Sequence, residues 1–289
     1  MLVLSTEEEM TGRADCWRRA GERIALVPTM GNLHEGHLSL VRIAASEADR
    51  VVVSIFVNPT QFGEGEDLDS YPRTPEEDLS ALRELDVDAV FLPGPSAVYS
   101  GGFSTWVEVE GLTEALCGAY RPGHFRGVTT VCAVLFGIVR PHVAVFGRKD
   151  AQQLAVIRRM AADLRMGVEV VAGPVVREAD GLARSSRNGY LSPDERRQAA
   201  AIYRGLSEAR RLASEGETDP RRLLAVVRKS VEPESMLRLQ YVELVDPDTM
   251  EPLAVLDRPG LLATAVFAGD TRLIDNVILK PDGNRNCGR

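Results

Sequence analysis

The sequence predicts an α/β protein: a Rossmann-like, doubly wound parallel sheet followed by a second, smaller α+β domain. Short runs of β-branched residues alternate with helical patterns, and such repeated units favour parallel strands joined by right-handed crossovers. The run RVVVSIFV at residues 50–57 is apolar on both faces, as strands covered by helices on both sides are. After about residue 176 the helical patterns become more polar, so we expect one domain over residues 1–175 and another over residues 176–289.

The elements follow one another in a regular order. The strands expected in the first domain lie at residues 24–29, 50–57, 88–92, 142–146 and 168–171. The helices expected between and beside them lie at residues 37–45, 81–85, 127–139 and 150–164. Pro141 ends the third helix because proline cannot continue one. In the second domain, helices are expected at residues 196–214 and 220–230, strands at residues 239–245 and 261–267, and a frayed polar tail at residues 280–289.

The composition is that of a globular protein with an acidic surface. With 34 Lys and Arg against 42 Asp and Glu, the formal charge is −8, which disfavours nucleic-acid binding because that needs a basic face. No apolar run approaches the roughly 20 residues of a membrane span, and the acidic first residues do not resemble a signal peptide. The cysteines are scattered, as unpaired thiols of a reducing compartment are: Cys16, Cys117, Cys132 and Cys287. We therefore expect a cytoplasmic protein that binds neither nucleic acid nor membrane.

The segment PTMGNLHEGHL at residues 28–38 lies where the first strand gives way to a helix. His34 and His37 are three residues apart and would face the same way, while Gly31 and Gly36 let the backbone approach a ligand. A helix N-terminus favours phosphate, and two imidazoles add hydrogen-bond donors. The spacing does not fit the HExxH of zinc proteases, and a pair of purely structural histidines remains the alternative. Because the P-loop and dinucleotide fingerprints are missing, a bound nucleotide would have its phosphates at this turn.

Three further segments follow strands or lie in the second domain. Asn58 and Gln61, after the second strand, are amides suited to hydroxyl and carboxyl groups; a turn capped by Asn58 is the alternative. Lys149 could neutralise phosphate, next to Asp150, which could cap the following helix or bind ribose. Residues 185–187, with two hydroxyls and a guanidinium, could hold phosphates or form an ordinary loop.

Two other loops could border the same cleft. The segment at residues 63–75, GEGEDLDSYPRTP, is rich in glycine, proline and acid, which is typical of a mobile lid. The segment RPGHFR at residues 121–126 could border the pocket or form a rigid turn before a helix. Since ligands of doubly wound sheets lie at the carboxyl ends of the strands, we expect the residues that follow residues 29, 57 and 146 to share one cleft.

Together these motifs resemble the pantothenate synthetase (pantoate–β-alanine ligase) family of the HxGH nucleotidyl-transferase superfamily. The resemblance runs from about residue 24 to residue 276, in the family's order: PTMGNLHEGH, FVNPTQF, YPRT, RPGHFRGV, KDAQQ, DGLARSSRNGYL and TRLIDN. It implies ATP-dependent condensation of pantoate with β-alanine to pantothenate, AMP and pyrophosphate through a pantoyl adenylate. It also implies ATP as a substrate, Mg²⁺ and a homodimer. Residues 1–175 would form the catalytic domain, and residues 176–289 a lid domain that carries the loop SSRN.

The resemblance assigns roles to individual residues. His37 would be the general acid, aided by His34 and Lys149, while Gln61 and Gln153, together with Asn58, would bind pantoate. Gln61 would also lie near β-alanine. The residues implied to bind ATP are Met30, Gly31, Asn32, Leu33, His34, Glu35, Gly36, His37, Gly147, Arg148, Lys149, Asp150, Val176, Arg184, Ser185, Ser186 and Arg187.

The chain departs from the family's pattern in places. The family often has Glu where Arg148 stands, and an aliphatic residue or Met where Arg184 stands. Members can place magnesium near the acidic residues after YPRT, here Glu77 and Asp78, but Ala81 offers no ligand and no protein metal site is expected. Two other functions stay open: a nucleotidylyltransferase that leaves the nucleotide on its product, and a nucleotide-binding regulator without turnover.

Overall fold

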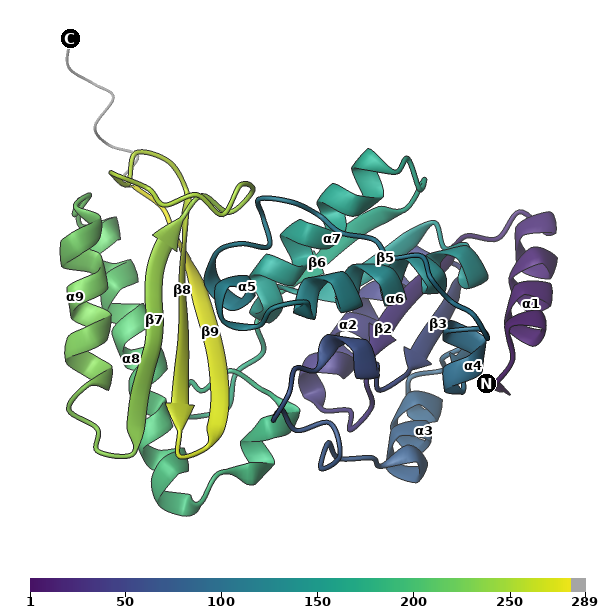
Figure 1. Cartoon of the computed structure of the whole chain (residues 1–289), viewed down its shortest axis with the longest axis horizontal. Helices are drawn as coiled ribbons and strands as arrows, with labels where there is room; N and C mark the ends of the chain where they lie inside the picture. The colour runs from purple at the N-terminus through teal and green to yellow at the C-terminus, as the bar shows by residue number, and fades with distance from the viewer. Residues whose placement is uncertain (282–289) are drawn as a thin grey trace, which may run out of the picture.

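The computed structural model describes residues 1–281 and contains the two kinds of sheet that the sequence predicts (Figure 1). One sheet has six parallel strands, and the other has three antiparallel strands. The fold-class prediction is therefore confirmed. The predicted fraying of the tail from residue 282 onward, and the thiol of Cys287, lie outside the described residues.

The parallel sheet has the order β1-β4-β3-β2-β5-β6. Its strands are β1 (Leu2–Leu4), β2 (Ile24–Thr29), β3 (Arg50–Ile55), β4 (Ala89–Phe91), β5 (Val143–Gly147) and β6 (Glu169–Gly173). The helices around it are α1 (Glu7–Arg19), α2 (Glu35–Glu47), α3 (Pro75–Glu84), α4 (Pro95–Val98), α5 (Leu116–Tyr120), α6 (His124–Val139) and α7 (Ala151–Asp163). Short 3₁₀ turns follow β3 and β5: η1 (Pro59–Gln61) and η2 (Arg148–Asp150).

Strand β2 lies where the strand order of the sheet reverses, because it pairs with β3 on one side and with β5 on the other. Alternate residues of the strands belong to two apolar clusters, one on each face of the sheet. Leu26 packs with α1, α6 and α7 on one face, whereas Val27 packs with α2 and α3 on the opposite face. In doubly wound sheets a crevice opens at the carboxyl ends of the strands where the order reverses, here beyond β2 and β5.

The C-terminal region comprises the turn η3 (Ser186–Tyr190), the helices α8 (Pro193–Ser214) and α9 (Pro220–Val231), and the strands β7 (Leu237–Val245), β8 (Gly260–Ala268) and β9 (Thr271–Leu279). The two helices pack on one face of this sheet. Its other face meets the first domain, where Tyr241 and Leu261 share an apolar cluster with Leu116 and Val156. In Figure 1, β9 is the strand of this sheet nearest to the parallel domain. The boundary at residue 175 stays a prediction.

Several elements differ from those that the sequence predicts. Strand β1 and helix α1 were not expected, because β1 is very short and α1 is mostly polar; the helix is fixed by a capping box between Thr6 and Glu9. Helix α2 begins two residues earlier than expected, since His34 caps it. Strand β9 was also missed, because polar residues interrupt its pattern.

Candidate active site

The segments after β2, β3 and β5 meet in one cleft of about 230 Å³, as the sheet topology predicts. Most of the site residues expected from the sequence line it: Met30, His34, Gly36, His37, Asn58, Gln61, Gly147, Lys149, Asp150, Gln153, Val176, Arg184, Ser185, Ser186 and Arg187. Apolar side chains form part of the wall, among them Phe56, Val131 and Leu135. The cleft therefore combines cationic, amide and apolar surfaces.

The remaining expected residues do not line the cleft. Glu35 forms an ion pair with Arg42 on the outside of α2, and the side chain of Arg148 is exposed. The residues Gly31, Asn32 and Leu33 form the turn that leads from β2 into α2. Both Gly31 (φ 84°) and Asn32 (φ 49°) are left-handed, a conformation that glycine and asparagine adopt most readily.

A buried carboxylate holds this turn. Asp78, on α3, is 2% exposed. Its Oδ2 accepts the backbone N–H of Asn32 at 2.9 Å, and its Oδ1 accepts that of Leu33 at 2.7 Å and the hydroxyl of Thr74 at 3.2 Å. A Cβ at Gly31 would lie 3.1 Å from Oδ2, so the close approach requires glycine. Sequence patterns could not indicate this role, because 46 residues separate Asp78 from Asn32.

We expect Asp78→Asn to lower the free energy of unfolding by about 2–4 kcal/mol, because hydrogen bonds to a charged group contribute about 1.5–3 kcal/mol each. An amide can accept at only one of its two ends, so one of the two N–H groups would face another donor. Urea unfolding measures the change. Glu77→Gln is the matched control, since Glu77 is the exposed neighbour on the same helix. Equal stabilities for the two variants would contradict the anchoring role.

The two histidines are fixed by the backbone of the helix that they begin. Nδ1 of His34 accepts the N–H of Gly36 at 3.1 Å, and Nδ1 of His37 accepts the N–H of His34 at 3.3 Å. The rings are stacked with their centroids 4.1 Å apart. A neutral imidazole that accepts at Nδ1 carries its proton on Nε2. Each ring therefore has an N–H donor at Nε2, and both rings line the cleft.

Both imidazoles are neutral at pH 7. Burial lowers the pKa of His34 to about 4, and the charges of Lys149 and Arg184 contribute in the same direction. Burial also lowers the pKa of His37 to about 3, again with a contribution from Lys149. The ammonium group of Lys149 thus lies close enough to both rings to influence their protonation. This corner of the cleft offers two neutral donors beside one positive charge.

Asn58 is buried, with 1% of its surface exposed, and its side-chain amide is fully engaged. Its nitrogen donates to Oε1 of Gln61 and to the carbonyl of Gly127, both at 3.1 Å. Its oxygen accepts the hydroxyl of Tyr99 at 2.8 Å and that of Thr60 at 3.0 Å. Asn58 consequently orients Gln61 and has no amide group left over for a ligand.

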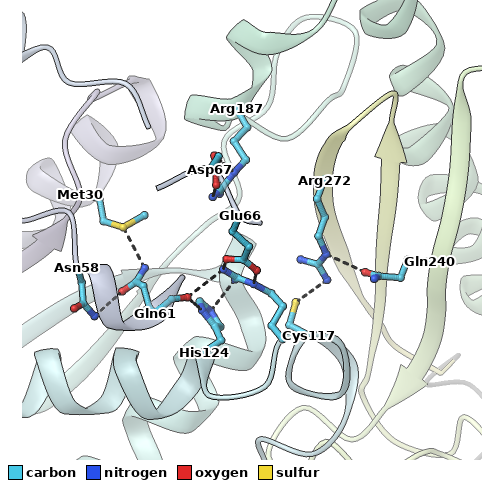
Figure 2. A network of polar contacts seen from close by, with 11 residues as sticks. Met30, Asn58, Gln61, Glu66, Asp67, Cys117, His124, Arg187, Gln240 and Arg272 are labelled. Carbon is cyan, nitrogen blue, oxygen red and sulfur yellow. Dashed lines mark hydrogen bonds and ion pairs between the residues drawn. The ribbon is translucent and has the colours of Figure 1, made fainter. Parts of the chain in front are cut away.

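Gln61 is held from several directions (Figure 2). Its side-chain nitrogen lies 3.1 Å from the sulfur of Met30, and its backbone carbonyl accepts from Nδ1 of His124 at 2.9 Å. Because Nδ1 of His124 donates, its Nε2 accepts from the guanidinium of Arg121, 3.0 Å away. Burial and the neighbouring Arg121 lower the pKa of His124 to about 4. The RPGHFR segment therefore borders the cleft.

The loop at residues 63–75 is tied to the walls of the cleft by two carboxylates. Glu66 forms a two-bond ion pair with Arg121 at 2.6 and 2.7 Å. Asp67 forms a similar pair with Arg187 at 2.6 and 2.9 Å. Figure 2 shows Glu66 beside His124 and Asp67 next to Arg187. In this conformation Arg187, one of the expected phosphate ligands, is already paired with a carboxylate.

Within residues 1–281, no three His, Cys, Asp or Glu residues are placed to hold a metal ion together. Among the helices described, none has the length and apolar content needed to cross a membrane.

A family model described as Pantoate-beta-alanine ligase matches residues 2–278 of the chain. The pantothenate synthetase of Syntrophotalea carbinolica is 56% identical to the chain over 259 residues, which cover 90% of this chain and 92% of that protein. The pantothenate synthetase of Syntrophobacter fumaroxidans is 51% identical over 281 residues, which cover 97% and 99% respectively.

Solved structures are similar as well. The crystal structure of a pantothenate synthetase from Thermus thermophilus matches with a TM-score of 0.92 and 45% identity, over 97% of this chain and 100% of that chain. A pantoate-beta-alanine ligase from Francisella tularensis, complexed with beta-gamma ATP and beta-alanine, matches with a TM-score of 0.80 and 31% identity, over 96% and 97%.

Proposed function

The chain belongs to the pantoate-beta-alanine ligase family, and we propose that its cleft joins pantoate to β-alanine through a pantoyl adenylate, with ATP as the other substrate. One observation carries the proposal. The neutral pair His34 and His37, the cation Lys149 and the loop at residues 185–187 surround one cavity whose wall also carries amide and apolar side chains. A triphosphate and a small hydroxy acid require these two kinds of surface side by side.

In the first step, a carboxylate oxygen of pantoate attacks the α-phosphorus of ATP, and the bond to the β-phosphate oxygen breaks to release pyrophosphate. Negative charge grows on the departing phosphates. The Nε2–H groups of His34 and His37, the N-terminus of α2 and Lys149 would stabilise that charge. In the unliganded cleft His37 is neutral. This supports hydrogen-bond donation by His37. A bound triphosphate would raise the pKa of His37, which favours the general-acid role that the resemblance implies.

Gln61 and Gln153 are proposed to hold the oxygens of pantoate, while Phe56, Val131 and Leu135 contact its dimethyl carbon. We expect Gln61→Ala to weaken pantoate binding about tenfold, because one or two hydrogen bonds of about 1 kcal/mol are lost. ATP binding should change less than twofold. Isothermal titration measures both constants, with Gln198→Ala as control, since Gln198 bonds to Met236 in the second domain. A larger effect on ATP than on pantoate would refute the assignment.

In the second step, the amine of β-alanine attacks the acyl carbon, the amide bond forms and AMP leaves. The acyl adenylate must be kept from water until then. The loop at residues 63–75 is the proposed cover, because Glu66 and Asp67 tie it to both walls of the cleft. Since Asp67 is paired with Arg187, the phosphates of ATP must replace this carboxylate before Arg187 can bind them.

Magnesium is proposed to enter with ATP. Both oxygens of Asp78 already accept backbone N–H groups, and Glu77 is exposed on the outside of α3. The chain therefore offers no free carboxylate pair here, and the ion would be held by phosphate oxygens and water, as Mg²⁺ commonly is. When bound, it would neutralise phosphate charge.

We also propose a cytoplasmic homodimer, as the resemblance implies. Trp106 is 42% exposed, large and apolar, and it packs against Phe103 and Tyr99. Aromatic side chains are enriched at interfaces between proteins, so this surface is the proposed contact between the copies. Sedimentation equilibrium tests the assembly.

A pyrophosphate-release assay in which each substrate is omitted in turn tests the proposed function. We expect ATP–pyrophosphate exchange that needs pantoate but not β-alanine, and free AMP with an amide product when all three substrates are present. A nucleotidylated product would instead indicate a nucleotidylyltransferase. ATP binding without pyrophosphate release would indicate a regulator.

A further inference from the structure

One residue of the C-terminal sheet holds a turn that borders the cleft. Asn276, in the middle of β9, is 6% exposed. Its side-chain nitrogen donates to two consecutive carbonyls of the turn η2, that of Arg148 at 3.0 Å and that of Lys149 at 2.9 Å. Both N–H groups of one amide thus bind a single turn that another domain provides. No other part of the proposed mechanism uses this residue.

The backbone of Asn276 is itself held in place. Asp275, 2% exposed, accepts the N–H of Asn276 at 2.7 Å. Arg177 forms a two-bond ion pair with Asp275 at 2.6 and 3.0 Å and also donates to the carbonyl of Asn276 at 3.2 Å. Arg177 follows Val176, whose carbonyl accepts the N–H of Arg184 at 2.9 Å. The amide of Asn276 is therefore presented to η2 from a rigid support.

The turn that Asn276 holds carries the backbone of Lys149. A lysine side chain is a flexible four-carbon stem, so a fixed backbone limits the region that its ammonium group can reach. The carboxylate that pairs with Nζ is that of Asp150, whose Oδ2 lies 3.8 Å away, too far for a strong restraint. η2 has no side-chain hydrogen bond at its N-cap. The two bonds from Asn276 are thus a main restraint on this turn.

We propose that Asn276 is a positioning residue that aims Lys149 at the phosphates of ATP. The proposal rests on the proposed function, because it assigns Lys149 to phosphate. The C-terminal domain would then act in the adenylation step itself, in addition to covering the cleft. A purely structural alternative is that Asn276 joins the two domains and contributes stability alone.

A double-mutant cycle on pantoate-dependent ATP–pyrophosphate exchange separates these alternatives. We expect Asn276→Ala to lower the exchange rate on the order of 10–100-fold, since two hydrogen bonds that orient a charged group are lost. Lys149→Ala should lower it on the order of 10²–10³-fold. If Asn276 acts through Lys149, the double variant is no slower than Lys149→Ala alone. Losses that multiply would overturn the proposal.

Controls make the result specific. Ser230→Ala removes a hydrogen bond of 2.8 Å to the carbonyl of Ala201 within the second domain and should leave exchange unchanged. Asn276→Asp keeps the shape of the side chain without its N–H donors, and it replaces the alanine variant in the cycle if circular dichroism shows the latter unfolded. Normal exchange by Lys149→Ala would mean that the role of Lys149 is wrong. A slow Lys149→Ala with a normal Asn276→Ala would overturn only the positioning role.

Discussion

His37→Ala is expected to slow pantoate-dependent ATP–pyrophosphate exchange on the order of 10²–10³-fold, the loss typical of one well-aimed donor to a developing negative charge. His37 lies at the N-terminus of α2, and Nδ1 accepts the N–H of His34, so its proton is on Nε2. Alanine removes this donor without inserting a larger group. The fold should stay intact, because the lost cap hydrogen bond contributes only about 1 kcal/mol.

The matched control is His142→Ala. Nδ1 of His142 also accepts a backbone N–H, that of Ile24 at 2.9 Å, but the residue lies before β5, at the strand end opposite the cleft. It should lose similar stability and keep its exchange rate. A folded His37→Ala variant with near-normal exchange would remove this residue from the mechanism, whereas equal losses in both variants would point to a general effect of destabilisation.

The second large effect is a loss of stability in mild acid. Burial lowers the pKa of His34 and His124 to about 4 and that of His37 to about 3, from a usual value of 6.5. Between pH 6.5 and 4, the unfolded chain binds protons on these rings that the folded chain does not. Unfolding therefore takes up protons, and its free energy falls as the pH falls. The stabilisation is complete above pH 6.5 and is lost as the pH drops towards the folded-state values.

The expected size is about 2 kcal/mol for each ring at pH 5, or up to about 6 kcal/mol for the three together. Urea unfolding at pH 7 and pH 5 measures it, and this window lies above the range in which most carboxylates titrate. His124→Gln should reduce the difference between the two pH values by about a third. A free energy of unfolding that stays constant from pH 7 to pH 5 would show that the rings are not neutral in the folded protein.

Much of the framework could be predicted from the sequence, because it depends on patterns that are local in the chain. The apolar run at residues 50–57 indicated a strand covered on both faces, and it became β3. The strand-to-helix junctions placed His34, Gln61 and Lys149 at one edge of the sheet, since parallel strands end together. Elements with a weak apolar pattern, such as α1 and β9, were not predicted, because polar residues interrupt their hydrophobic periodicity.

The sequence by itself thus determined the class of fold, the order of its motifs and most of the residues expected to gather at the cleft. The tertiary structure alone decided which side chains hold those residues: Asp78 under the turn at residues 31–33, Asn276 on η2, and Asp67 on Arg187. Each of these contacts joins residues far apart in the chain. A hydrogen bond between two such residues does not appear as a periodic pattern in the sequence around either of them. The neutral state of His34 and His37 was likewise decided by tertiary structure, because burial and nearby cations, not residue type, set their pKa values.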